Sequence, residues 1–184
     1  MPTEQEYAVH VGVLEHNGLV ALWESIKAGH TDDSNWSPGK AFEYLVLRAF
    51  QIEGAEVCWP YSVHVSGMVV EQIDGVVYTE GLACVVESKD WKDQTGFGPI
   101  AKLRSVLLRR PVGTVGLLFS RSGFTEAARR LAEFLAPQTI LLWSGTDVTY
   151  ALTRETMIDG LRLKYRYAIE HALPEYRLTE EEKL

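Results

Sequence analysis

Three charged residues, Asp74, Glu87 and Lys89, lie within two apolar stretches that need no charge for packing. Residues 68–78 and 82–89 are rich in β-branched side chains, and each is short enough to be a single strand. Only a few polar residues separate them. The sequence therefore predicts a β-hairpin that carries an Asp on one strand and a Glu and a Lys on the other.

The turn of this hairpin sets which residues face each other. Glu80-Gly81 is typical of a two-residue hairpin turn, and it pairs Thr79 with Leu82. The pairing then runs back along both strands and places Asp74 opposite Glu87. Directly paired residues share one face of a sheet, so we expect the two carboxylates to lie on the same face.

The predicted face could hold a metal ion. Side chains alternate along a strand, so Lys89 joins Glu87 while the side chain of Ser88 turns away. Carboxylates on neighbouring strands, with Cβ atoms about 5 Å apart, repel unless a cation lies between them. Asp74, Glu87 and the backbone carbonyl of Ser88 would give Mg²⁺ or Mn²⁺ a partial oxygen shell, with Lys89 beside a water or a phosphate. The alternative is a solvated strand end without chemistry.

Composition limits the classes of protein to consider. The 184 residues suit one domain, expected over 1–184, and no stretch approaches the roughly 20 apolar residues of a membrane span. The polar, acidic segment 1–6 is unlike a signal peptide, so we expect a cytoplasmic protein without a membrane partner. A net charge of −7 disfavours non-specific coating of nucleic acid, although a local basic face can still bind phosphates.

The cysteines offer a different chemistry. Cys58 and Cys84 fall in predicted strands without metal-ligand spacing, so we expect reduced core thiols. A hydrolase built on Cys84 and His64 is disfavoured, because Cys84 has the opposite strand parity from Glu87 and apolar neighbours that disfavour a thiolate.

Helices must position the hairpin from either side. A covering helix is predicted at 14–28, and Ser37-Pro38 is typical of a helix start, with a second helix running to Gly54. Glu43 borders the apolar stripe of that second helix, where it either faces solvent or leans toward the hairpin. A further strand is predicted at 55–65, before the hairpin.

Basic residues follow the hairpin in a second group of elements. Lys102 and Arg109 recur along one side of a helix predicted at 100–110, and Arg121 lies in a turn after a buried strand expected to run parallel to the Glu87 strand. Taken alone, these three residues could simply form a solvated basic face. The remaining predictions are a loop at 90–99, strands at 112–119 and 138–143, helices at 125–136, 147–152 and 155–172, and a frayed tail at 178–184.

The order of these elements, from the helix with Glu43 through the strands with Asp74 and with Glu87-Ser88-Lys89 to a helix and a strand, resembles the PD-(D/E)XK nuclease superfamily. The chain looks most like the Mrr-type restriction endonuclease domain, over roughly 37–143, with a turn into the helical segment 124–128. It departs from that pattern in having no proline before Asp74, and a Glu at position 87 where Mrr-type proteins often have Gln. The resemblance implies an α/β fold with a restriction-endonuclease-like core of α-β-β-β-α-β order, a mixed β-sheet flanked by helices, and extra helices at 14–28 and 146–172.

The resemblance also implies roles for the charged residues. Asp74 and Glu87 match the family's metal-binding carboxylates, Lys89 its catalytic lysine, and Glu43 the acidic residue on the first core helix. The implied reaction is hydrolysis of a nucleic-acid phosphodiester by water with Mg²⁺ or Mn²⁺, with DNA as the expected substrate and restriction or defence as the setting. In this mechanism Lys102, Arg109 and Arg121 would bind backbone phosphates of the nucleic acid. A homodimer or a partner subunit is left open. The alternative is a catalytically silent nucleic-acid-binding or scaffold module with the same fold.

Overall fold

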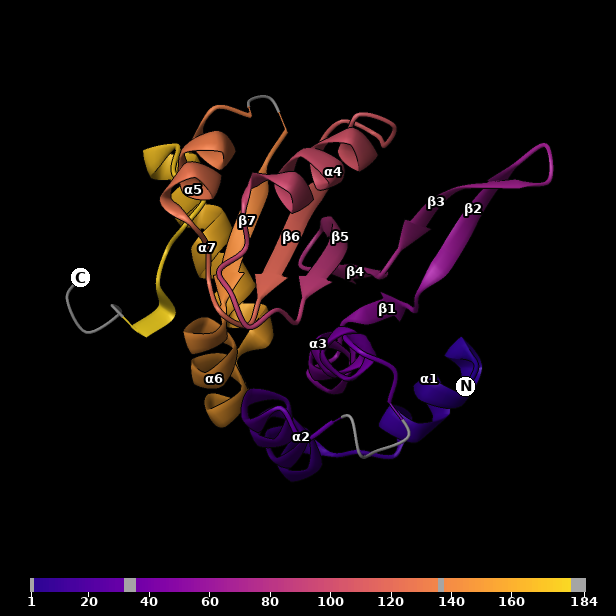
Figure 1. The fold of residues 1–184 in the computed structure, drawn as a ribbon. Coiled ribbons are helices and arrows are strands. Elements are labelled where there is room, and N and C mark those ends of the chain that lie inside the picture. The colour runs from indigo at the N-terminus through magenta and orange to yellow at the C-terminus, as the bar shows by residue number, and fades with distance from the viewer. Residues whose placement is uncertain (1, 32–35, 136–137, 180–184) are drawn as a thin grey trace.

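The computed structural model describes residues 2–31, 36–135 and 138–179. A five-stranded sheet in the order β1-β4-β5-β6-β7 forms its centre (Figure 1). β1, β4 and β5 pair antiparallel, and β5, β6 and β7 pair parallel. The strands of this mixed sheet are β1 Glu56–Cys58, β4 Gly75–Thr79, β5 Leu82–Lys89, β6 Val115–Ser120 and β7 Ile140–Ser144. The parallel pairing of β5 with β6 confirms the sequence prediction.

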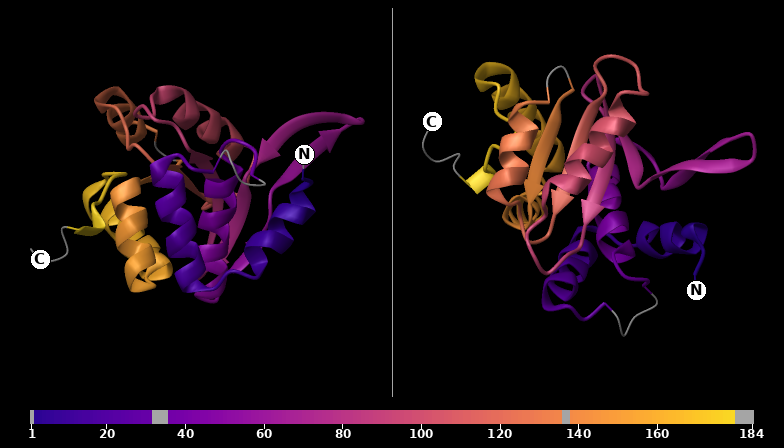
Figure 2. Two further views of the ribbon diagram at one scale, coloured as in Figure 1. Left: turned by 60° about the horizontal axis from the view of Figure 1, so that its bottom comes forward. Right: turned by 45° about the horizontal axis from the view of Figure 1, so that its top comes forward.

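Two helical layers cover the sheet (Figure 2). α3 packs on one face, where Cys84 and Val86 join a core with residues from α1, α2, α6 and α7. α4 and α5 cover the other face, where Val85 and Leu118 pack against them. The helices are α1 Glu4–Gly12, α2 His16–Ala28, α3 Lys40–Ile52, α4 Phe97–Leu107, α5 Glu126–Glu133, α6 Gly145–Arg154 and α7 Met157–His171. Alternate residues of β5 therefore point toward different helices, as a strand buried on both faces requires.

A two-stranded arm projects from the sheet (Figures 1 and 2). It consists of β2 Tyr61–Val65 and β3 Met68–Ile73, which pair only with each other. The sequence predicts longer strands at 55–65 and 68–78, and the structure divides each of them. The first is interrupted at Trp59-Pro60, where proline has no backbone N–H to pair. The second bends at Asp74, which separates β3 in the arm from β4 in the main sheet.

The N-terminal region contains one helix that was not predicted from the spacing of apolar residues. α1 begins after Thr3, whose hydroxyl accepts the backbone N–H of Glu6 while the Glu6 carboxylate accepts the backbone N–H of Thr3. This capping box stabilises the first turn of a short helix. α3 begins at Lys40 rather than at Pro38, because Gly39 has a φ of 81° and ends the preceding turn.

The C-terminal region differs from the predicted frayed tail at Leu178. This side chain is buried, and its backbone N–H donates to Asp147 Oδ1 at 2.9 Å. The buried ammonium of Lys164 lies 3.1 Å from the other oxygen of Asp147, so one buried carboxylate joins α6, α7 and the tail. Residues 180–184 of the predicted tail lie outside the described part. No helix within the described ranges is long and apolar enough to cross a membrane.

Candidate active site

The hairpin has the register that its turn predicts. β4 pairs with β5 from Thr79–Leu82 to Gly75–Val86, and Glu80 and Gly81 both have positive φ, as a tight hairpin turn requires. The last pair is Gly75 with Val86, so Asp74 itself is unpaired and lies in the bend between β3 and β4. The bend therefore frees Asp74 from strict strand alternation at the carboxyl end of β5.

The Asp74 carboxylate is held against the end of β5. Its Oδ2 accepts the backbone N–H of Ser88 at 2.7 Å and the Ser88 hydroxyl at 3.0 Å. Burial raises the pKa of Asp74, and the charge of Glu87 raises it further, while the Ser88 hydrogen bonds and Lys89 oppose the shift. Strand alternation predicts that Ser88 turns away from Asp74. The structure corrects this point, because the bend lets the carboxylate reach the Ser88 hydroxyl.

Glu87 lies on the face of the sheet that α4 covers, and it is only 3% exposed. The Lys89 ammonium is 2.5 Å from its Oε1, and the Lys102 ammonium is 2.9 Å from both of its oxygens. Lys89 also donates to the backbone carbonyl of Ser88 at 3.0 Å. A buried carboxylate needs such partners, and two ammonium groups supply them here.

Glu43 approaches from the opposite layer, on the first turn of α3. It is 7% exposed, which disagrees with the solvent-facing interpretation of this residue. Burial and then the charge of Asp74 raise the pKa of Glu43 to about 8, although Lys40 donates to both of its oxygens at 2.8 and 3.0 Å. Glu43 thus lies close enough to Asp74 for their charges to interact. Lys40 is a partner of Glu43 that was not predicted, although two residues spaced by three on a helix are neighbours on its surface.

The oxygen donors fit a hard divalent cation in their chemistry. Glu87 is buried and Asp74 is partly buried, their charges interact, and the Ser88 carbonyl shares the Lys89 ammonium with Glu87. Within the part of the chain that the structure describes, no three His, Cys, Asp or Glu side chains are arranged as a metal-binding group. Lysine ammonium groups balance the carboxylates instead. A metal ion at Asp74 and Glu87 would therefore compete with Lys102 for Glu87.

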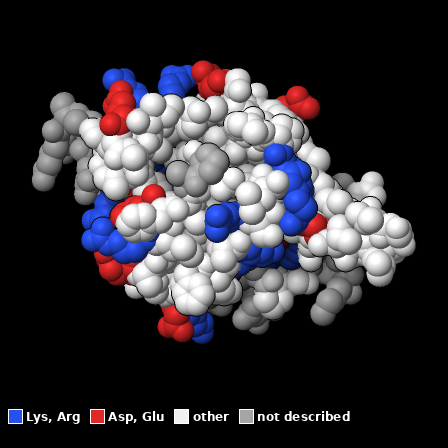
Figure 3. All heavy atoms as spheres, turned by 90° about the horizontal axis from the view of Figure 1, so that it is seen from above, with Lys and Arg blue, Asp and Glu red and all other residues white. Residues whose placement is uncertain are grey.

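The three predicted phosphate-binding residues are in different surroundings. Lys102 is half exposed beside Glu87, and Arg109 is similarly exposed while pairing with the buried Glu71 at the base of the arm. Arg121 is only 13% exposed, with Nε 2.6 Å from Asp90 and a guanidinium N–H donated to the Ile26 carbonyl. Figure 3 shows Lys and Arg side chains gathered on the face beside the arm. The half-exposed Lys102 and Arg109 reach solvent, whereas Arg121 joins segments of the protein.

The alternative built on Cys84 and His64 does not form a site. Cys84 is fully buried in the α3 core, and burial raises the pKa of its thiol to about 12. His64 is exposed on the projecting arm. The prediction that both cysteines are core thiols is wrong for Cys58, which is exposed on β1 at the edge of the sheet.

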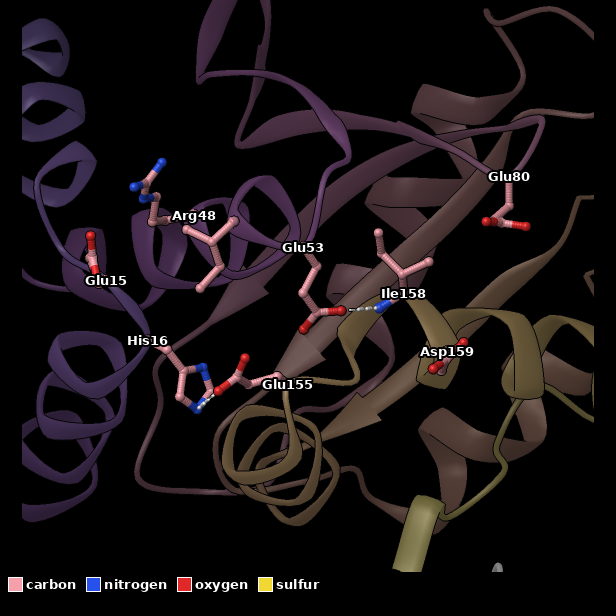
Figure 4. A pocket seen from close by; sticks show the side chains of 9 residues that line it. Glu15, His16, Arg48, Glu53, Glu80, Glu155, Ile158 and Asp159 are labelled. Carbon is pink, nitrogen blue, oxygen red and sulfur yellow. Dashed lines mark hydrogen bonds and ion pairs between the residues drawn. The ribbon is translucent and has the colours of Figure 1, made fainter.

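A pocket of about 760 Å³ lies at the opposite end of the hairpin, beside Glu80 in the β4–β5 turn (Figure 4). Several acidic side chains line the pocket, but the Glu53 carboxylate already accepts hydrogen bonds from the protein. This carboxylate accepts the backbone N–H groups of Met157 and Ile158 at the start of α7. His16 lies 3.7 Å from Glu155 in the same pocket. These contacts join the end of α3 to the start of α7, and the start of α2 to the α6–α7 connection, which is a structural role.

Several solved structures are similar to the chain. The small subunit of the heterodimeric restriction endonuclease R.BspD6I has a TM-score of 0.57 and 13% identity, over 91% of this chain and 94% of that one. The restriction endonuclease MspJI, solved in complex with a 27-mer oligonucleotide, has a TM-score of 0.45 and 18% identity, over 98% of this chain and 41% of that one. A protein of unknown function has a TM-score of 0.47 and 21% identity, and the chain spans 56% of its length. The likeness to the R.BspD6I subunit shows the restriction-endonuclease fold.

The family comparison covers the whole predicted core. No curated protein matches the sequence. The model of the Mrr_cat family, described as restriction endonuclease, matches residues 35–152. The match includes Glu43, Asp74, Glu87 and Lys89. Because it spans more than half of the 184 residues, the chain belongs to the Mrr_cat restriction endonuclease family.

Proposed function

We propose that the protein is a divalent-metal-dependent nuclease that hydrolyses phosphodiester bonds of nucleic acid, with DNA as its substrate. The observation that carries the proposal is the meeting of Asp74, Glu87 and Lys89 at the carboxyl end of β5, within a chain of a restriction endonuclease family. Carboxyl ends of parallel strands are where α/β folds place ligands.

Each residue has a separate task in this proposal. Asp74, Glu87 and the Ser88 carbonyl would hold the metal ion, and Glu43 would add a carboxylate from α3. When bound, Mg²⁺ or Mn²⁺ would offset negative charge at the phosphate and lower the pKa of a water molecule. Lys89 stays beside Glu87, where its ammonium neutralises a phosphate oxygen or orients the attacking water. Lys102 and Arg109 bind backbone phosphates on the α4 side.

The relatives support DNA as the substrate and are compatible with a second protein subunit. Restriction endonuclease is the description of the family, and R.BspD6I is heterodimeric. A homodimer or a second subunit would supply the second cut that a duplex needs, since one site cleaves one strand. Restriction or defence is the biological setting that we propose.

A cleavage assay tests the proposal. The wild-type protein is incubated with single-stranded and duplex DNA and RNA in Mg²⁺, in Mn²⁺ and in EDTA, beside Lys89→Ala. Lys27→Ala, at a lysine on α2 that pairs with Glu24, is the matched control. We expect cleavage by the wild type and by Lys27→Ala with metal only, and none by Lys89→Ala. A wild type that retains DNA in a shift assay but cuts nothing with either metal would support the silent binding module instead.

A further inference from the structure

An exposed tryptophan stands beside the proposed site. Trp91 follows Lys89 by two residues, and its ring centroid is 5.9 Å from the Lys89 ammonium. The structure describes all five tryptophans of the chain, and among them only Trp91 is classed as exposed, with 47% of its surface accessible. Large aromatic side chains that face solvent next to a site are candidates for contact with a ligand.

The segment that carries Trp91 is fixed at both ends. The Ser122 hydroxyl donates to the Trp91 carbonyl. Four residues on, the backbone N–H of Thr95 donates to the Gly123 carbonyl at 2.8 Å, and its hydroxyl lies 2.7 Å from that of Ser120. Thr95 is completely buried. The β6–α5 connection thus holds the backbone around Trp91 in place, and a ligand would not have to order it.

Trp91 is not needed to hold the Lys89 side chain in place. A separation of 5.9 Å is at the outer limit of about 6 Å for a cation–π contact, which is weak at exposed sites. Lys89 is already held by Glu87 at 2.5 Å and by the Ser88 carbonyl at 3.0 Å. About half of the Trp91 surface is exposed, so the indole remains available for another planar group.

The nature of that group follows from the neighbouring phosphate site. The ring centroid of Trp91 is 5.9 Å from the Lys89 ammonium, so a phosphate held by Lys89 would bring a base of the same or the next nucleotide close to the indole. Aromatic side chains stack on nucleobases with little regard to sequence. Paired bases inside a duplex are covered on both faces, so only an unpaired base offers a face to Trp91.

We propose that Trp91 stacks on an unpaired nucleobase at or next to the phosphate that Lys89 contacts. The preferred substrate is then single-stranded, or is a duplex with a base displaced from the stack near the cut. The inference rests on the proposed nuclease function and deepens it by naming the form of the substrate.

The test compares Trp91→Ala with Trp91→Phe. Binding of fluorescein-labelled single-stranded DNA is measured by anisotropy in EDTA, so that no cleavage occurs. The DNA is the shortest oligonucleotide that the wild type binds, so that its register is fixed, and it carries one abasic site at each position in turn. We expect Trp91→Ala to weaken binding about tenfold, the gain from stacking one base, and Trp91→Phe to recover most of it. At one abasic position the wild type and Trp91→Ala should bind alike. The slope of affinity against salt should not change, because no cation is removed.

Three controls decide between outcomes. Phe134→Ala, at an exposed aromatic residue 80% accessible near the end of α5, should leave binding unchanged. A duplex with one bulged base should respond to Trp91→Ala as the single strand does, and a perfect duplex should not. Equal weakening of every oligonucleotide, abasic or not, would overturn the stacking proposal, as would a lower cleavage rate with unchanged affinity. A wild type that cuts with metal but shows either of these results refutes stacking alone, whereas a wild type that neither binds nor cuts refutes the nuclease proposal itself.

Discussion

The Lys102 ammonium lies 2.9 Å from both carboxylate oxygens of Glu87. Both oxygens of Glu87 are therefore engaged by Lys102, and a metal ion bound to Glu87 would have to compete with this ammonium group. Half of the Lys102 side chain is exposed, so the pair is worth at most about 1 kcal/mol. We predict that Lys102→Met tightens Mn²⁺ binding by about two- to fivefold, measured by calorimetric titration without nucleic acid.

The control for this prediction is Arg104→Met, which removes an exposed cation from the same helix without touching Glu87. Its Mn²⁺ affinity should match that of the wild type. Weaker metal binding in Lys102→Met than in Arg104→Met would show that Lys102 supports the metal site rather than competing with it.

Neutralising the two carboxylates should affect stability differently, although repulsion alone would predict that both changes are harmless. Asparagine at position 74 keeps an oxygen for the Ser88 donors. It also removes a negative charge that burial disfavours, as the raised pKa of the Asp74 carboxyl group indicates. Asp74→Asn should therefore leave the free energy of unfolding unchanged or slightly higher. Glu87→Gln leaves Lys89 and Lys102 without their carboxylate, which should cost about 1–3 kcal/mol. Urea denaturation in EDTA measures both, and equal effects would contradict the arrangement described for Glu87.

Glu43 should make the metal-free protein less stable as pH rises. Burial and then the Asp74 charge raise its pKa from 4.5 to about 8, so between these values the folded state binds more protons than the unfolded state. The free energy of unfolding therefore falls through this window and levels off above it. Glu43→Gln should remove at least about 1 kcal/mol of the fall between pH 5 and pH 8. Parallel curves for the two proteins, from urea titrations in EDTA, would contradict the raised pKa.

Arg121 should matter for stability more than for phosphate binding. Its guanidinium pairs with Asp90 and donates to the Ile26 carbonyl at the end of α2, with little solvent access. We predict that Arg121→Met lowers the free energy of unfolding by about 1–3 kcal/mol and leaves the salt dependence of DNA binding unchanged. Arg109→Met is the comparison, because the half-exposed Arg109 should reduce the salt slope by about one. The reverse pattern in the two variants would restore Arg121 as a phosphate ligand.

The hairpin was predictable because its signals are local. Glu80-Gly81 fixes the turn, and the strand pattern carries the register back to Gly75. The first helix was equally readable from Thr3 and Glu6, whose spacing is that of a capping box. Local hydrogen bonds decide such features, so they need no knowledge of the rest of the chain.

The contacts that complete the site depend on long-range packing. The pairing of Lys102 with Glu87 requires α4 to cross β5, which no spacing in the sequence specifies. The same holds for Gly75, where an added Cβ would lie 2.4 Å from a methyl group of Leu47 on α3. Only the close approach of α3 to β4 explains why glycine follows Asp74. Burial of Glu43 has the same origin, since its depth depends on how α3 lies against the sheet.

The most direct test of the central claim is the location of a bound metal ion. A crystal soaked in Mn²⁺ gives an anomalous difference map, in which manganese scatters strongly and Mg²⁺ does not. We predict one peak bounded by Asp74, Glu87 and the Ser88 carbonyl, and its absence in Glu87→Gln. A peak instead in the acidic pocket beside Glu53 and Glu155, with none at Asp74, would contradict the account (Figure 4).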